Sequence, residues 1–130
     1  MQALLEAVKA RCEAHLPAST RVFLEEAPDS ATIDYVVMRD SLAGMPDYTN
    51  GDDYTEEREI QFHVWGTRST AVRQLLDALP AWFKAAMPLD VGSVMYARKS
   101  GTDTLEVDPN REPDGQVWHG IVSMQFQVQR

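Results

Sequence analysis

Two stretches of strict alternation constrain this chain more than any other feature. In residues 58–65 (REIQFHVW), Ile60, Phe62 and Val64 alternate with polar side chains. In residues 117–129, the apolar positions 122, 124, 126 and 128 alternate with serine and glutamine. A period of two places successive side chains on opposite faces of a strand. The chain is therefore expected to contain a sheet with one face turned toward an apolar core.

Two other segments carry apolar residues at helical spacing. The N-terminal stripe comprises Leu4, Leu5, Val8, Cys12 and Leu16. It predicts a helix over residues 1–16 that Pro17 ends. The second stripe comprises Val72, Leu75, Leu76, Leu79 and Phe83, with Thr67 or Ser69 as the expected N-cap. Pro80 either kinks this helix or starts a second short one.

The remaining β signals complete the expected order. Residues 21–24 form a short extended piece, and residues 32–39 (TIDYVVMR) are rich in the β-branched and aromatic residues of strands. Residues 93–107 form a further β region, bent around Ser100 and Gly101. We expect an α+β fold in the order α-β-β-α-β-β. A four-stranded, mostly antiparallel sheet would carry helices packed on one face. The 130 residues suit a single domain over 1–130.

A long loop is expected over residues 40–57, where turn formers and acidic residues replace apolar ones. Its acidic residues are Asp47, Asp52, Asp53, Glu56 and Glu57. They lack the alternating spacing of a calcium loop, so a solvated, mobile loop is favoured over a calcium or magnesium site. The two prolines and the glycine of residues 108–115 predict another loop between strands.

Candidate chemistry is sparse. His63 and His119 lie on expected strands and come close if those strands pair, but two imidazoles alone do not make a zinc site. Cys12 lies on an apolar stripe, which favours a core residue over a nucleophile. No phosphate-cradling loop and no nucleophile elbow is present. We therefore expect no catalytic residue, no cofactor and no metal.

Charge and cysteine content narrow the partners and the location. A net charge of −8 disfavours nucleic-acid binding, although an acidic surface would suit a conduit that DNA passes through. A single cysteine cannot form an internal disulfide, in keeping with a reducing cytoplasm. Neither a bilayer-spanning run nor a secretory signal is recognised, so no membrane partner is expected.

Aromatic side chains are the strongest candidates for an interface. Trp65 is out of phase with the apolar side of its strand, whereas Trp118 is in phase at the start of the last strand. Such aromatics either anchor a partner or are buried in a second small cluster. The candidate interface residues are Asp47, Tyr48, Asp52, Asp53, Tyr54, Trp65 and Trp118.

The layout resembles the tail-terminator (tail-completion, minor tail protein U-like) family of long-tailed bacteriophages. Three stretches carry the resemblance: Glu59 to Leu79 with IQFHVWGTRSTAVRQLLDAL, Asp108 to Gly120 (DPNREPDGQVWHG), and the polar loop from Asp40 to Glu57. The resemblance implies a virion subunit, assembled in a bacterial cytoplasm, that forms a ring, usually a hexamer. Such a ring caps the tail tube, meets the head-side connector and passes DNA through its lumen. The family's long loop is mobile in the free subunit and orders on assembly.

Pro80 and the bent strand at Ser100 depart from that family pattern. They leave a head–tail connector or neck protein as the alternative within the structural class. The alternative from another class is a small-molecule enzyme or binding domain. His63 and His119 would be its strongest candidate site residues.

Overall fold

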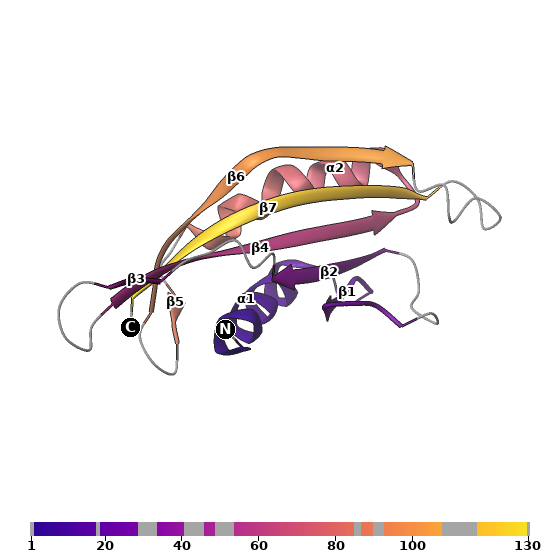
Figure 1. Cartoon of the computed structure of the whole chain (residues 1–130). Coiled ribbons are helices and arrows are strands. Elements are labelled where there is room, and N and C mark those ends of the chain that lie inside the picture. Colours follow the sequence, from indigo (N-terminus) through magenta and orange to yellow (C-terminus); the bar gives the residue numbers. More distant parts are fainter. Residues whose placement is uncertain are drawn as a thin grey trace.

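A computed structural model of the chain describes residues 2–17, 19–28, 34–40, 46–48, 54–84, 87–89, 93–107 and 117–129 (Figure 1). Its elements are α1 (Gln2–His15), β1 (Arg21–Leu24), β2 (Tyr35–Asp40), β3 (Pro46–Tyr48), β4 (Tyr54–Gly66), α2 (Ser69–Ala78), the 3-10 helix η1 (Leu79–Phe83), β5 (Met87–Pro88), β6 (Ser93–Val107) and β7 (Trp118–Gln129).

One sheet organises these elements. Six strands lie side by side in the order β1-β2-β4-β7-β6-β5, and a seventh, β3, pairs with the first residues of β4. All pairs are antiparallel except β1 with β2. The α+β class and the mostly antiparallel sheet are confirmed. The expected four strands and the order α-β-β-α-β-β are wrong, because β1, β3 and β5 also join the sheet.

β1 matches the short extended piece expected over residues 21–24, which was not counted among the four strands. β3 and β5 were missed because they contain three and two residues, too few to display a period of two. β3 and the first residues of β4 fall inside the segment expected to be one loop over 40–57. The expected loop over 108–115 lies outside the described residues.

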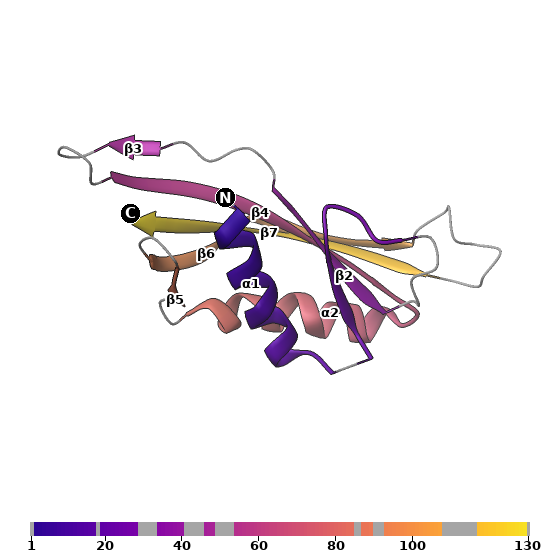
Figure 2. The ribbon, with the colours of Figure 1, turned by 90° about the horizontal axis from the view of Figure 1, so that it is seen from below.

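Helices α1, α2 and η1 cover one face of the sheet, as expected (Figure 2). The core between them is made of Leu4, Leu5, Val8, Cys12, Val22, Val36, Met38, Ile60, Phe62, Val64, Val72, Leu76, Leu79, Phe83, Val94, Val122, Met124, Phe126 and Val128. The apolar alternating positions of β4 and β7 form the sheet side of this core, because the even-numbered side chains of both strands face the helices. Both alternating stretches are therefore confirmed as half-buried strands.

Helix α2 approaches the sheet closely over β7. A Cβ at Gly120 would lie 2.6 Å from Leu76 Cδ1 and 2.9 Å from Val72 Cγ1. Gly66 meets Val72 from the end of β4, where a Cβ would lie 2.8 Å from Val72 Cγ2. The two glycines thus permit a helix-to-sheet distance that any side chain would increase.

The turn into α2 differs from the expected cap. Its N-cap is Arg68, with no side-chain hydrogen bond. Asp34, which adopts a positive φ of 75° at the start of β2, instead accepts a hydrogen bond from the Thr67 backbone N–H at 3.3 Å. Pro80 lies in the first turn of η1, which begins at Leu79, so a second short helix follows α2 as one of the two interpretations of this proline expected. The bend in β6 is also present, as a register shift between Ser100 and Thr104.

Candidate functional site

The sheet face opposite the helices, called the open face below, carries a row of aromatic rings across four neighbouring strands. Tyr35, Trp65 and His119 lie directly opposite one another on β2, β4 and β7. Phe23 on β1 extends the row, with its ring centroid 5.9 Å from that of Tyr35 in an edge-on arrangement. We call Phe23, Tyr35, Trp65 and His119 the aromatic ladder.

The ladder is tightly stacked at its centre. The Trp65 and His119 rings are 4.2 Å apart and inclined by 3°, and Trp65 also stacks on Tyr35 at 5.1 Å. Such aromatic pairs stabilise a sheet by about 0.5–1.5 kcal/mol each beyond the area that they bury. The stacked rings therefore fix the relative positions of β2, β4 and β7.

A pair of histidines is built into this row. His63 Nδ1 lies 2.9 Å from His119 Nε2, and His63 Nε2 lies 3.2 Å from the Gln61 side-chain oxygen. Because an amide oxygen only accepts, His63 Nε2 carries its hydrogen and His63 Nδ1 accepts from His119. Burial lowers the pKa of His63 to about 4, helped by the positive influence of His119 and of Arg39. His63 is therefore neutral at neutral pH.

Burial divides the ladder and the adjoining His63 into a hidden part and an accessible part. Tyr35 and His63 are buried, whereas Phe23, Trp65 and His119 are half-buried. Arg21 and Arg39 are exposed and share the parity of the ladder on β1 and β2. The Arg21 guanidinium carbon lies 5.9 Å from the centroid of the Phe23 ring. A partner on this surface would meet aromatic faces bordered by two arginines.

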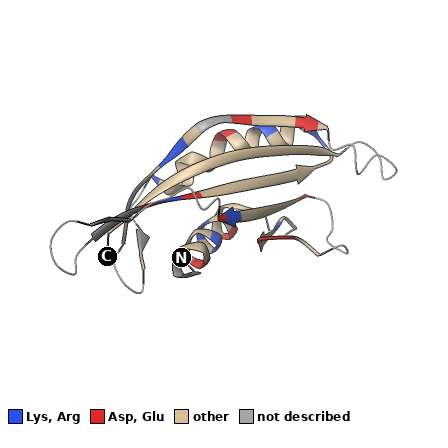
Figure 3. Cartoon of the chain, in the orientation of Figure 1, with Lys and Arg blue, Asp and Glu red and all other residues tan. Residues whose placement is uncertain are grey.

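The other half of the open face is polar and internally bonded. Gln125 donates to Glu57 at 2.9 Å and accepts from the Arg98 guanidinium at 2.8 and 3.1 Å. Ser100 donates to Glu59 at 3.0 Å. These bonds join β4, β7 and β6, while β7 itself carries no charged residue between 118 and 129 (Figure 3). Gln125 of β7 therefore links a glutamate of β4 to an arginine of β6.

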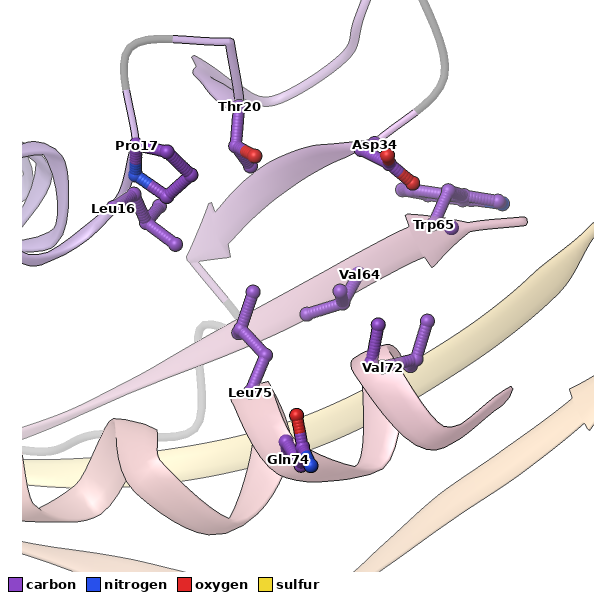
Figure 4. A pocket seen from close by; sticks show the side chains of 11 residues that line it. Leu16, Pro17, Thr20, Asp34, Val64, Trp65, Val72, Gln74 and Leu75 are labelled. Atoms are coloured by element: carbon purple, nitrogen blue, oxygen red, sulfur yellow. The ribbon is translucent and has the colours of Figure 1, made fainter. Parts of the chain in front are cut away.

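A pocket of about 420 Å³ lies at the end of β4, between β4 and α2. Leu16, Val64, Val72 and Leu75 form apolar walls, and Asp34 and Trp65 lie together at one end (Figure 4). The carboxylate of Asp34 is already engaged by Thr67. The pocket can hold a large apolar side chain, and its polar groups do not converge as a catalytic site requires.

The expected interface residues that the structure describes fall in three different places. Trp65 projects from the open face, as its phase indicated, whereas Trp118 packs against the core on the helix side. Asp47, Tyr48 and Tyr54 belong to β3 and the start of β4. Asp52 and Asp53 lie outside the described residues. Only Trp65 thus belongs to the ladder, and the interface role of all seven residues stays a prediction.

Sequence reasoning did not identify Phe23 and Tyr35 as ladder residues, or Arg39 as their neighbour on the open face. Their signal was a parity within residues 32–39, where Tyr35, Val37 and Arg39 alternate with Val36 and Met38. All four residues from Tyr35 to Met38 are buried, so composition hid the alternation.

Cys12 lies in an environment that does not activate its thiol. Burial, with a smaller effect of Glu13, raises the pKa of Cys12 to about 12, which removes the thiolate at neutral pH. Within the described ranges, no group of three or more His, Cys, Asp and Glu side chains could hold a metal ion. Among the described helices, none is long and apolar enough to cross a membrane.

Comparisons with known proteins identify the fold. No protein-family model matches the chain, and no curated protein matches it. A chain in the virion of a native gene transfer agent particle matches with a TM-score of 0.72 at 13% identity, over 99% of this chain and 96% of the other. The gp17 protein of bacteriophage SPP1 matches with a TM-score of 0.56 at 23% identity, over 96% and 88%. The fold of this chain is thus one used by proteins of phage and phage-like particles.

Proposed function

We propose that this chain is a structural subunit of a phage or phage-like particle, and specifically a tail terminator. In this role, copies of the chain form a ring, taken to be a hexamer, at the head-side end of the tail tube. The ring ends tail growth and offers its other face to the head-side connector. DNA passes through the lumen without being bound specifically.

The observation that carries the proposal is the end-to-end likeness to a virion chain, at a TM-score of 0.72 over 99% of this sequence. The composition of the open face of this chain also agrees with assembly. Its aromatic rings, arginines and hydrogen-bonded amides lie on an accessible sheet face, away from the helices. Flat faces of this composition are typical of protein–protein contacts. The net charge of −8 suits a channel wall that does not retain phosphate.

Deleting the gene from the phage or prophage tests the proposal against its alternative, a head–tail connector or neck protein. Without a terminator, tail tubes grow past their normal length, because nothing caps the last ring. Without a neck protein, tails of normal length fail to join heads. Electron micrographs of the deletion lysate distinguish the two. Normal particles in the lysate would refute both roles.

A further inference from the structure

The pocket at the end of β4 combines apolar walls with a carboxylate at one end. Leu16, Val64 and Leu75 form the walls, and Asp34 lies beside Trp65 at that end (Figure 4). A side chain that fits both parts needs an apolar stem and a positively charged head. Lysine carries a compact cationic head on a flexible four-carbon stem. The composition of the pocket therefore favours a lysine over a purely apolar residue.

The backbone holds Asp34 in a position suited to such a contact. Its φ of 75° is uncommon for a residue other than glycine. Its Oδ1 accepts a hydrogen bond from the Thr67 backbone N–H at 3.3 Å, and a carboxylate has several further acceptor sites. The side chain is exposed, and no ion pair joins it to a basic side chain of the described residues. A cation from outside the chain can therefore reach it.

Lys84, directly after η1, is the matching cation that a second copy offers. It is exposed. The other basic side chains in the described ranges, except Arg68, already make an ion pair, a hydrogen bond or a ring contact. Arg68 follows Gly66, which lines the pocket. A contact through Arg68 would thus pair the same surface of two copies and would not extend into a ring.

Two helices separate Lys84 from the pocket of its own chain. α2 and η1 contain ten and five residues and run from Ser69 to Phe83. At a rise of about 1.5 Å per residue they span about 22 Å, far more than a lysine side chain reaches. Figure 2 shows α2 starting near the end of β4 and running back along the sheet toward β5. A contact between Lys84 and this pocket must therefore join two copies.

We propose that Lys84 of one copy enters the pocket of the next copy, an inference that rests on the proposed ring. The aliphatic stem packs between Leu16 and Leu75, and the ammonium group donates a charge-assisted hydrogen bond to the Asp34 carboxylate. Because the lysine and the pocket lie at opposite ends of α2 and η1, the contact is head-to-tail. Repeated head-to-tail contacts close into a ring when the rotation between copies allows it.

Neutral substitutions of similar size test the contact. Asp34→Asn keeps an oxygen that accepts from Thr67 and a residue type that tolerates positive φ, so it removes the charge alone. Lys84→Gln removes the cation. Asp77→Asn is the matched control, because it neutralises another exposed carboxylate on α2. Circular dichroism and urea unfolding confirm that each variant folds, and analytical ultracentrifugation, alone and with tail tubes, measures assembly under conditions where the unaltered chain forms rings.

Asp34→Asn and Lys84→Gln should each weaken self-association about tenfold, while the Asp77→Asn control assembles normally. The double variant Asp34→Asn/Lys84→Gln should assemble no worse than either single variant. Each single change already removes the same contact, so the two effects are not additive.

A pair of new cysteines tests whether the two groups lie side by side. Ala71 lines the pocket, Ala81 lies one turn before Lys84, and both are exposed. Positions 71 and 81 are about 15 Å apart along the helices, too far for a disulfide within one chain. Oxidation of Ala71→Cys/Ala81→Cys with diamide should therefore give a ladder of linked chains on a non-reducing gel. The control Ala81→Cys/Thr104→Cys has its second cysteine on the open face and should give nothing beyond dimers, since the native Cys12 is buried.

Four results would overturn the inference. Folded Asp34→Asn and Lys84→Gln chains that assemble normally, or a cysteine pair that stays unlinked within rings, would exclude this contact and leave the proposed ring intact. A loss of assembly with Asp34→Asn but not with Lys84→Gln would also exclude it, because another group would then occupy the pocket. An unaltered chain that assembles neither alone nor on tail tubes would refute the ring and the contact together.

Discussion

The indole of Trp65 and the imidazole of His119 lie 4.2 Å apart and within 3° of parallel, as direct partners across β4 and β7. This stack orients the His119 ring so that it also contacts His63, its diagonal neighbour across β4 and β7. One cross-strand pair thus orders a tryptophan and two histidines on the open face. Four properties of the folded chain follow from contacts of this kind.

Acid should destabilise the chain through His63. The folded chain holds the pKa of His63 at about 4, below the ordinary 6.5, so the unfolded chain binds more protons between these two values. Stability is therefore complete above pH 6.5 and falls as the pH decreases toward 4. We expect a loss of about 2 kcal/mol between pH 7 and pH 5 from this group. Urea unfolding at the two pH values measures it, and His63→Gln is the control. An equal loss in the His63→Gln chain would contradict the assignment.

Gly120→Ala should destabilise the chain by crowding α2. Its new Cβ would lie within 2.9 Å of Val72 Cγ1 and closer still to Leu76. Overpacking of a filled core costs about 1–3 kcal/mol. Combining the change with Val72→Ala removes part of the clash, so the double variant should lose less stability than the sum of the single variants. Urea unfolding of all four proteins checks this, and strict additivity would mean that the crowding is relieved elsewhere.

Asp103→Asn should loosen the junction of α2 with the bent part of β6. Asp103 accepts hydrogen bonds from Lys99 and from Arg73, each at 3.1 Å. The bond from Lys99, then Arg73, lowers the pKa of Asp103, so this stabilisation is present at neutral pH and is lost as acid protonates the carboxyl. Since both cations are partly exposed, we expect a loss of about 1 kcal/mol that decreases in high salt. A double-mutant cycle with Arg73→Ala measures the coupling, and a value near zero would contradict it.

Cys12 should resist thiol reagents in the folded chain. Its side chain is fully buried on α1, and burial raises the pKa of the thiol to about 12. Reaction with a disulfide reagent at pH 8 should therefore follow the rate of unfolding and become fast in urea. Rapid labelling of the native protein would show that α1 detaches from the sheet.

Sequence periodicity predicted the long helices and strands, because an element with one buried face carries apolar residues at regular spacing. Ile60, Phe62 and Val64 showed it on β4, and Leu5, Val8 and Cys12 showed it on α1. The same reasoning missed β3 and β5, since two or three residues complete no period. It also misplaced the cap of α2, because the group that bonds Thr67 comes from Asp34, far away in sequence.

The site was only partly predictable for a related reason. The phase of Trp65 gave its face, and pairing of two strands was enough to suggest that His63 and His119 meet. The register that places Trp65 opposite both Tyr35 and His119 depends on long-range strand pairing, which no local pattern specifies. The packing of Trp118 against the core followed from its parity along the last strand alone.

The position of β7 between β4 and β6 has a consequence for synthesis on the ribosome. The two longest strands bond to β7 and not to each other, although both precede it in the chain. A nascent chain that has emerged only as far as residue 107 therefore presents two long strand edges with no partner between them. Such edges readily bind other chains. Synthesis of β7 then supplies the strand that pairs with both of these edges.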